Sequence, residues 1–315
     1  MRRVNLVAND GGTMTAGRVG ALAGALAAAG VACVAYGALV ERHWYQLRRE
    51  TVPVLEQGQP PSTILHLSDF HLLARDSRRL RFLAELAELP VDLVVVTGDI
   101  LGEPAALEVA LESLRRFRPR VGAVAVLGSN DYYPPRFKNY FAYFLPRRRI
   151  RLPRAHNPWR ELVDGLERAG WLVLSNQRAR LGDLELAGMN DPHIRLDDSA
   201  VPVPPDGNGT RLRIGVVHSP YQRSLNAFER SGYQLVLAGH THGGQVCLPG
   251  IGALVTNCDL PRDRVRGLSR WGSSWLHVSA GLGTSKYAPF RFACRPEASL
   301  LSLVPRSHKA QTDLA

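Results

Sequence analysis

Cysteine is scarce in this sequence, and the few cysteines stand far apart. The chain of 315 residues contains four of them, at Cys33, Cys247, Cys258 and Cys294, with no Cys-x-x-Cys pair and no internal repeat. This spacing argues against a disulfide framework and gives no support to a cysteine-based zinc site.

Negative charge is in deficit as well. The 28 Asp and Glu residues are outnumbered by 39 Lys and Arg residues, which leaves a net charge of +11. Such a balance favours acidic partners, namely phosphates, nucleic acid or an anionic membrane surface, without choosing among them. The hydrophobic fraction of 45% and the charged fraction of 21% are those of a globular protein, long enough for one large domain or two small ones.

Charged residues are missing altogether from residues 19–40, which read VGALAGALAAAGVACVAYGALV. At 1.5 Å per residue, this run is long enough to span the hydrocarbon core of a bilayer. A signal peptide is the alternative, but its apolar region usually covers only about 7–15 residues. We therefore predict that residues 1–18 precede an uncleaved anchor at 19–40, in a single-pass protein of the cell membrane.

The side of the membrane stays open, because the basic residues around the span are balanced. Three arginines precede it and three follow it, so the positive-inside rule gives nearly a tie. Met14 is a plausible alternative start, and starting there would slightly favour a cytoplasmic domain. The arginines counted are Arg2, Arg3, Arg18, Arg42, Arg48 and Arg49.

Residues 41–62 follow the span and are expected to form a juxtamembrane linker. Trp44 and Tyr45 suit the membrane interface, and Pro60 and Pro61 stop regular structure. Residues 306–315 are typical of a loose tail. These limits leave residues 63–305 as the main domain.

Within residues 63–305, short apolar β-branched runs alternate with helical patterns, which indicates an α/β fold with covered sheets. The expected strands cover residues 63–67, 92–97, 122–127, 171–175, 183–188, 212–217, 234–238 and 275–279. The expected helices cover about 77–89, 104–117 and 158–169.

Acidic residues are absent from residues 132–160, where arginines and a lysine interleave with aromatic residues. Such a long insertion is often functional or disordered. One interpretation is a lid or a membrane-facing grip on an anionic, lipid-linked substrate, and the other is a solvated loop. Nucleic-acid binding could use the same residues, but the anchor makes membrane lipids the nearer substrate.

Polar side chains follow five of the expected strands at the points where the strands end. They are Asp69 with His71, Asp99, the run Ser129-Asn130-Asp131, His218, and His240 with His242. Sites in open α/β sheets form beyond the carboxyl ends of the strands. A single Asp or His at such a place is usually a turn or structural residue, but the whole series favours a metal site.

Two pairs in this series, Asp69/His71 and His240/His242, are two residues apart. In an extended segment such residues point the same way, so each pair can present two ligands to one point. Imidazole and carboxylate together suit Mn, Fe or Zn, and a carboxylate can bridge two ions. Two ions about 3.5–4 Å apart can clamp a phosphoryl group and generate hydroxide.

The motifs Asp-x-His, Gly-Asp, a block similar to Gly-Asn-His-Asp, His and Gly-His-Thr-His resemble the calcineurin-like metallophosphoesterases over about residues 63–305. The stretches GHTHGGQVCLPGIGA, GMNDPH and GLGTSKYAPFRFACRPE resemble the bacterial branch that carries a membrane anchor. The resemblance implies a four-layer α/β/β/α sandwich, here preceded by one transmembrane helix. It also implies two divalent metal ions and in-line attack on phosphorus by a metal-bridging hydroxide. The implied ligands are Asp69, His71 and His242 for the first ion, Asp99 as the bridge, and His218, His240 and an asparagine for the second.

The chain departs from the family at Gly128-Ser129-Asn130-Asp131, where the usual block is Gly-Asn-His-Asp. Either Ser129 occupies the place of the ligand asparagine, or the loop shifts and Asn130 reaches the metal. We favour Asn130, because an amide oxygen is a better ligand than a neutral hydroxyl. The helper histidine is missing in both cases, and such general-acid help is typically worth about 10²–10⁴-fold.

Two further histidines have open roles. His193, in the stretch MNDPH, is a candidate to replace the missing helper, although a structural role in its loop is the commoner outcome. His66 lies within the expected strand before Asp69 and is interpreted as a packing residue or a support of the site.

The sequence as a whole predicts a membrane-anchored, metal-dependent phosphoesterase. We expect it to cleave phosphodiester or pyrophosphate bonds, with a phospholipid or glycolipid among the candidate substrates, and with Asp99, Asn130 and Asp131 as catalytic residues. The alternatives are a nuclease or nucleotide phosphodiesterase, and a metal-binding scaffold with little turnover. The oligomeric state and the metal identity are left open.

Overall fold

The computed structural model describes residues 16–135, 153–204, 209–284 and 286–306. Most of the predicted basic and aromatic insertion, residues 136–152, lies outside the described residues, as does nearly all of the predicted tail. The predictions made for these two segments therefore stay predictions.

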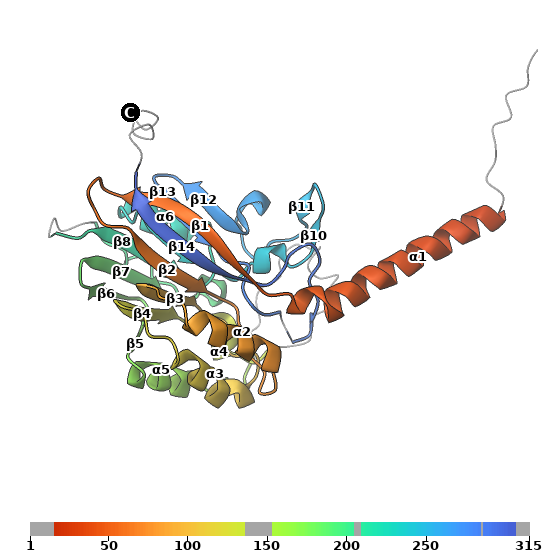
Figure 1. Ribbon diagram of the computed structural model, residues 1–315, viewed down its shortest axis with the longest axis horizontal. Helices are drawn as coiled ribbons and strands as arrows, with labels where there is room; N and C mark the ends of the chain where they lie inside the picture. The colour runs from red at the N-terminus through yellow and green to blue at the C-terminus, as the bar shows by residue number, and fades with distance from the viewer. Residues whose placement is uncertain (1–15, 136–152, 205–208, 285, 307–315) are drawn as a thin grey trace, which may run out of the picture.

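Two six-stranded sheets form the centre of the domain (Figure 1). The order in the first sheet is β1 (Gln46–Leu55), β14 (Glu297–Pro305), β2 (Ser62–Leu67), β3 (Leu93–Thr97), β4 (Gly122–Val126) and β5 (Trp171–Val173). The order in the second is β12 (Gly267–Trp271), β13 (Ser274–Val278), β9 (Leu235–Ala238), β8 (Leu212–Val217), β7 (Leu184–Met189) and β6 (Gln177–Leu181). Strands β2 to β5 run parallel to one another, and so do β7, β8, β9 and β13.

The sheets pack face to face, with helices on the two outer faces. Side chains from both sheets, among them Val95, Val124, Ile214 and Leu237, share one buried apolar layer. The first sheet is covered by α2 (Ser77–Ala87), α3 (Leu107–Leu114) and α5 (Trp159–Arg168), and the second by α6 (Gln222–Arg230). The predicted four-layer α/β/β/α sandwich is confirmed.

Short elements complete the domain and sit mostly in the loops that follow the strands. They are α4 (Ser129–Tyr132), the hairpin β10 (Cys247–Leu248) and β11 (Gly252–Ala253), and the 3-10 turns η1 (Glu41–His43), η2 (Pro104–Ala106), η4 (Pro192–Ile194), η5 (His242–Gly244) and η6 (Arg262–Arg264). Two of them, α4 and η5, carry residues of the predicted metal site.

The segment expected to be a linker, residues 41–62, is instead built into the first sheet. Strand β1 pairs in parallel with β14 from Gln46 to Leu55. The prediction failed because β1 is an edge strand whose first half carries charged residues, such as the half-exposed Arg48 and the exposed Arg49, and only its end, from Val52 to Leu55, is apolar. The domain therefore begins directly after the first helix.

That first helix, α1 (Ala16–Leu39), stands clear of the domain (Figure 1). A candidate span of 21 residues, Ala23–His43, has a mean hydropathy of 1.9 and is long and apolar enough to cross a membrane by length and composition. The predicted anchor at residues 19–40 falls largely within this helix.

The end of α1 is fixed to the domain by the loop before β14. The carbonyl oxygen of Gly37 accepts a hydrogen bond from the Arg291 backbone N–H at 3.2 Å. The buried carboxylate of Glu41 accepts the N–H groups of Ala293 and Cys294 at 3.0 and 2.6 Å. Backbone and charge-assisted hydrogen bonds of this kind hold the helix end in one position.

Candidate active site

The predicted ligands converge at the carboxyl ends of strands from both sheets. Asp69 and His71 follow β2, Asp99 follows β3 and Asn130 follows β4, all in the first sheet. His218 follows β8, and His240 and His242 follow β9, in the second sheet. All of them except the half-buried Asn130 are buried.

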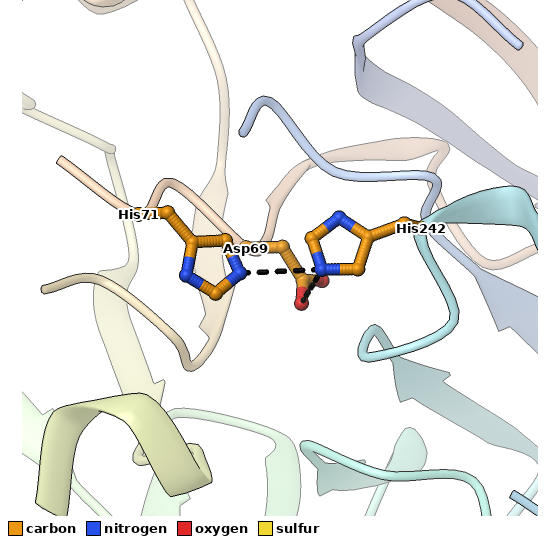
Figure 2. A group of neighbouring side chains, drawn as sticks. All are labelled: Asp69, His71 and His242. Carbon is orange, nitrogen blue, oxygen red and sulfur yellow. Dashed lines mark hydrogen bonds and ion pairs between the residues drawn. The ribbon is translucent and has the colours of Figure 1, made fainter. Parts of the chain in front are cut away.

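One group of side chains consists of Asp69, His71 and His242, which point toward one another from both sheets (Figure 2). The Nε2 atoms of His71 and His242 are 3.2 Å apart, and His242 Nε2 is 3.6 Å from Asp69 Oδ1. The single ligand atoms that these three residues offer lie within 4.8 Å of one another, so they can hold one metal ion.

A second group, Asp69, Asp99 and His218, lies next to the first. Asp99 connects the two, because its Oδ2 is 3.5 Å from His71 Nε2 and its Oδ1 is 3.4 Å from His218 Nε2. His240 joins this side of the site, with its Nδ1 atom 3.3 Å from His218 Nε2. Each oxygen of the Asp99 carboxylate therefore faces a different set of candidate ligands.

These spacings fit coordination to metal ions. Ligand atoms about 2.0–2.2 Å from one ion lie about 3–3.5 Å from each other in tetrahedral or octahedral geometry. The Oδ1 atom of Asp69 is buried without a hydrogen-bond partner among the described residues, although a buried carboxylate oxygen normally has one. Imidazole nitrogens with carboxylate oxygens are the donor set of first-row divalent ions.

Burial keeps three of the histidines in the form that binds metal. It lowers the pKa of His71 to about 4 and the pKa values of His240 and His242 to well below the ordinary value. The three rings are therefore neutral at neutral pH, and only a neutral imidazole has a free nitrogen lone pair for a metal ion.

Asp99 and His218 form a buried ion pair. Burial alone would raise the pKa of Asp99, but the neighbouring His218 and His71 hold it well below its ordinary value. Burial alone would lower the pKa of His218. The effect of the Asp99 carboxylate is larger, so the pKa of His218 lies well above its ordinary value. His218 would have to lose its proton to become a ligand, so metal binding here would release a proton.

The backbone is strained where the ligands sit. Nine non-glycine residues of the described chain have positive φ, and five of them are Asp69, His71, Asp99, His240 and His242, with φ between 44° and 70°. The two i, i+2 pairs are therefore not in extended segments, and the expected reason for their convergence was wrong. Left-handed backbone costs about 1–3 kcal/mol per residue and persists at functional sites where the surroundings impose it.

Two glycines leave room for the ligands. A Cβ atom at Gly128 would lie 2.2 Å from Asp99 Oδ1, and one at Gly239 would lie 2.6 Å from Asp69 Oδ2. Neither site could accept a side chain without moving a carboxylate, so these positions require glycine.

Asn130 lies at the site, beside Asp99. Its backbone N–H donates to Asp99 Oδ1 at 2.8 Å, and its side-chain amide donates to Asp99 Oδ2 at 2.6 Å. The amide thus lies beside the carboxylate that connects the two groups. Its role as a metal ligand stays a prediction.

Asp131 has contacts that favour a positioning role over the predicted catalytic one. Its carboxylate accepts the backbone N–H groups of Ile100, Leu101 and Gly128 at 2.7, 2.9 and 2.9 Å. The side chain is buried and turned toward the backbone, so it holds the loop after β3 against the loop after β4. Burial and the charge of Asp99 raise its pKa to about 7.

His193 lies at the edge of the site, with its ring 4.5 Å from the ring of His240. Its Nδ1 atom is 3.1 Å from the Tyr221 hydroxyl. Its predicted part in replacing the missing helper histidine stays a prediction.

Sequence reasoning missed Arg291, a buried cation behind the site. The guanidinium of Arg291 donates to the carbonyl oxygens of Ala280 and Gly283 at 2.7 and 2.6 Å, and its Nη1 lies 3.4 Å from the carbonyl oxygen of His242. An arginine with 0% exposure is rare, but nothing in the local pattern FRFACR distinguishes it from a surface arginine.

A four-layer sandwich with buried carboxylates and imidazoles at its strand ends defines a metal-dependent phosphoester hydrolase. The family model of the calcineurin-like phosphoesterases matches residues 62–244. The chain belongs to this family, as its motifs indicate, and its substrate is a phosphoester.

Relatives extend the similarity beyond the family model. The metallophosphoesterase YkuE of Bacillus subtilis is 27% identical over 91% of this chain and 95% of its own length. The phosphodiesterase YaeI of Escherichia coli is 26% identical over 84% of this chain and 90% of its own length. A transmembrane protein with metallophosphoesterase domain from Danio rerio is 28% identical over 73% of this chain and 50% of its own length.

Proposed function

We propose that the protein is a membrane-anchored phosphodiesterase or pyrophosphatase with two divalent metal ions in its site. The observation that carries this proposal is the position of Asp99, whose two carboxylate oxygens face His71 and His218, respectively. Asp69, His71 and His242 would hold one ion, His218, His240 and Asn130 the other, and Asp99 would contact both.

The residues of the chain have separate tasks in this proposal. Bound divalent ions supply Lewis acidity toward the phosphoryl oxygens and lower the pKa of water. The strained strand ends fix the ligands before substrate arrives, and the buried walls of the site exclude competing water. Because the block Gly128-Ser129-Asn130-Asp131 lacks the histidine of the family, proton donation to the leaving group is weak at this place. A phosphodiester or pyrophosphate with a good leaving group suits such a site best.

The anchor supports a substrate at the membrane. Arg291 bonds to Gly37 of α1 through its backbone and to the loops behind the site through its side chain. The hairpin β10–β11 is next to this junction, because Cys247 pairs with Phe292, whose ring contacts Tyr36 of α1 edge-on at 6.4 Å. Helix α1 and the hairpin therefore meet on one side of the domain.

This side of the domain exposes apolar side chains. Ile251 at the hairpin tip is 72% exposed, and Leu248 and Tyr287 are each 39% exposed. Exposed apolar residues beside a membrane span fit the interfacial layer of a bilayer. We therefore propose that the bilayer covers the hairpin and that the substrate is the phosphate group of a membrane lipid or lipid-linked sugar.

The metal requirement is the first test of this function. The full-length protein in detergent should lose its hydrolysis of bis-p-nitrophenyl phosphate when a chelator removes the metal. Added Mn²⁺ should raise the rate of hydrolysis by at least about a hundredfold, since metal assistance is worth several kcal/mol. Tight Mn²⁺ binding without turnover on this ester or on a pyrophosphate would instead support the metal-binding scaffold.

The contact of the hairpin with the bilayer is tested by fluorescence. In Ile251→Trp, reconstituted in vesicles, the added tryptophan emission should be quenched by brominated lipid, because the side chain enters the interface. Val121→Trp is the matched control, since Val121 is also exposed but directly precedes β4, at the opposite end of the strand from Asn130. Equal quenching of the two variants would refute membrane contact at the hairpin.

A further inference from the structure

Four polar side chains lie buried behind Asp69. Ser68 and His66 come from the end of β2, Thr97 from the end of β3, and His277 from β13 in the opposite sheet. All four have 0% exposure. Burying so many polar groups is costly unless every one of them has a hydrogen-bond partner.

These side chains form one continuous chain of hydrogen bonds that ends on Asp69. Its links are His277 Nδ1 to His66 Nδ1 at 2.8 Å, His66 Nε2 to Thr97 Oγ1 at 3.0 Å, Thr97 Oγ1 to Ser68 Oγ at 2.7 Å, and Ser68 Oγ to Asp69 Oδ2 at 2.6 Å. The chain thus connects the second sheet to a candidate metal ligand of the first.

The carboxylate at one end determines where every proton lies. An ionised carboxylate only accepts, so Ser68 donates to Asp69 and must accept from Thr97. Thr97 then donates to Ser68 and accepts from His66, which requires the proton of His66 on Nε2. The Nδ1 atom of a neutral His66 is therefore an acceptor, and the proton of His277 must be on Nδ1.

Both rings are in the neutral form that this order needs. Burial lowers the pKa of His66 to well below its ordinary value, and burial together with Arg48 lowers the pKa of His277 to about 3. The remaining nitrogen, His277 Nε2, is 3.9 Å from Glu50 Oε2 and has no hydrogen-bond partner among the described residues. The order of protons therefore runs in one direction, toward Asp69.

The hydrogen-bond chain gives the two carboxylate oxygens of Asp69 different surroundings. Oδ2 accepts from Ser68 and from the backbone N–H of His240 at 2.9 Å. Oδ1 is the buried atom without a hydrogen bond in the described chain, and it faces His242. One oxygen is thus held by the protein, and the other is turned to the candidate metal position.

We propose that Ser68, Thr97, His66 and His277 are positioning residues that hold Asp69 for metal binding through this chain. The inference rests on the proposed function in one respect, namely that Asp69 binds a metal ion. Partners of metal ligands fix ligand orientation and basicity, and their loss typically weakens metal affinity about 10–100-fold. Chains of hydrogen bonds also strengthen one another at low dielectric, so a break in the middle weakens the contact at the end.

The proton order is measured first, in a way that does not depend on metal. In full-length protein labelled with ¹⁵N-histidine, His66 should show the neutral Nε2–H form and His277 the neutral Nδ1–H form. The two rings are assigned among the ten histidines by comparison with His66→Gln and His277→Gln. Either ring in the opposite tautomer, or charged at neutral pH, would overturn the inference.

Metal affinity tests the positioning role. Thr97→Val, which replaces the hydroxyl in the middle of the hydrogen-bond chain with a methyl group, should raise the Mn²⁺ dissociation constant about tenfold, measured by electron paramagnetic resonance. Thr97→Ser keeps the hydroxyl and should restore the affinity. Ser299→Ala is the matched control, because Ser299 is paired with His66 in the sheet and fully buried, but its hydroxyl has no partner among the described residues.

The outcomes distinguish this inference from the proposed function. A dissociation constant for Thr97→Val within twofold of the unaltered protein would overturn the positioning role and leave the metal site intact. Failure of the unaltered protein to bind Mn²⁺ would contradict the proposed function. The tautomers of His66 and His277 would still confirm or refute the order of protons in the hydrogen-bond chain. If Thr97→Val does not fold, the tautomers of His66 and His277 in the unaltered protein decide whether the inference holds.

Discussion

Asp99→Asn is expected to lower the rate of metal-dependent phosphodiester hydrolysis about a thousandfold or more. The substitution keeps the shape of the side chain but removes the charge that faces both His71 and His218. It also places an amide N–H₂ against the N–H donors of Asn130. Loss of several kcal/mol of transition-state stabilisation corresponds to this factor, and turnover of bis-p-nitrophenyl phosphate with saturating Mn²⁺ measures it.

The control for Asp99→Asn is Asp92→Asn, at the other end of the same strand. Asp92 is also buried, and it accepts the Thr63 N–H at 2.8 Å, far from the ligands. The control variant should keep its turnover to within a few-fold. Comparable turnover of the two variants would show that Asp99 is not part of the metal site.

Asp131→Leu is expected to destabilise the fold by about 3–6 kcal/mol. The substitution leaves three buried backbone N–H groups, those of Ile100, Leu101 and Gly128, without an acceptor, and each costs about 1–3 kcal/mol. The midpoint of thermal unfolding should therefore fall by about 6 °C or more, since 1 kcal/mol shifts it by about 2–4 °C in a large domain. Differential scanning calorimetry of the protein in detergent measures this change.

The stability of Asp131→Asn tests the mechanism behind that loss. An asparagine keeps one carbonyl oxygen, which can still accept from Ile100 and Leu101, but it presents N–H₂ to Gly128. We therefore expect an intermediate midpoint. If Asp131→Asn and Asp131→Leu both unfold at the midpoint of the unaltered protein, the three N–H groups do not depend on this carboxylate.

The sequence was most informative where apolar strands end in polar residues. All eight expected strands are present within a few residues, because buried parallel strands have continuous apolar runs that are easy to recognise. Asp69, His71, Asp99, His218, His240 and His242 come together because the carboxyl ends of these strands meet. The metal site could be predicted from the positions of these residues along the chain, each after an expected strand.

The sequence was least informative where contacts between distant segments determine the structure. Strand β1 exists because β14 pairs with it across some 250 residues, and its own residues are half polar. The hydrogen-bond chain behind Asp69 depends on His277, which nothing in the pattern SSWLHVSA distinguishes from an ordinary strand histidine. The left-handed backbone of the ligands was missed as well, since none of the five is a glycine.

The junction between α1 and the domain fixes the helix against the domain, so the helix is not joined to it through a flexible linker. Arg291 bonds both to Gly37 and to the loops behind the site, so a rotation of the helix would also move these loops. A helix longer than the local hydrocarbon thickness tilts. Where α1 spans a bilayer, the thickness of that bilayer would set the angle at which the site meets the lipid head groups, so membrane composition would act as a regulator of access.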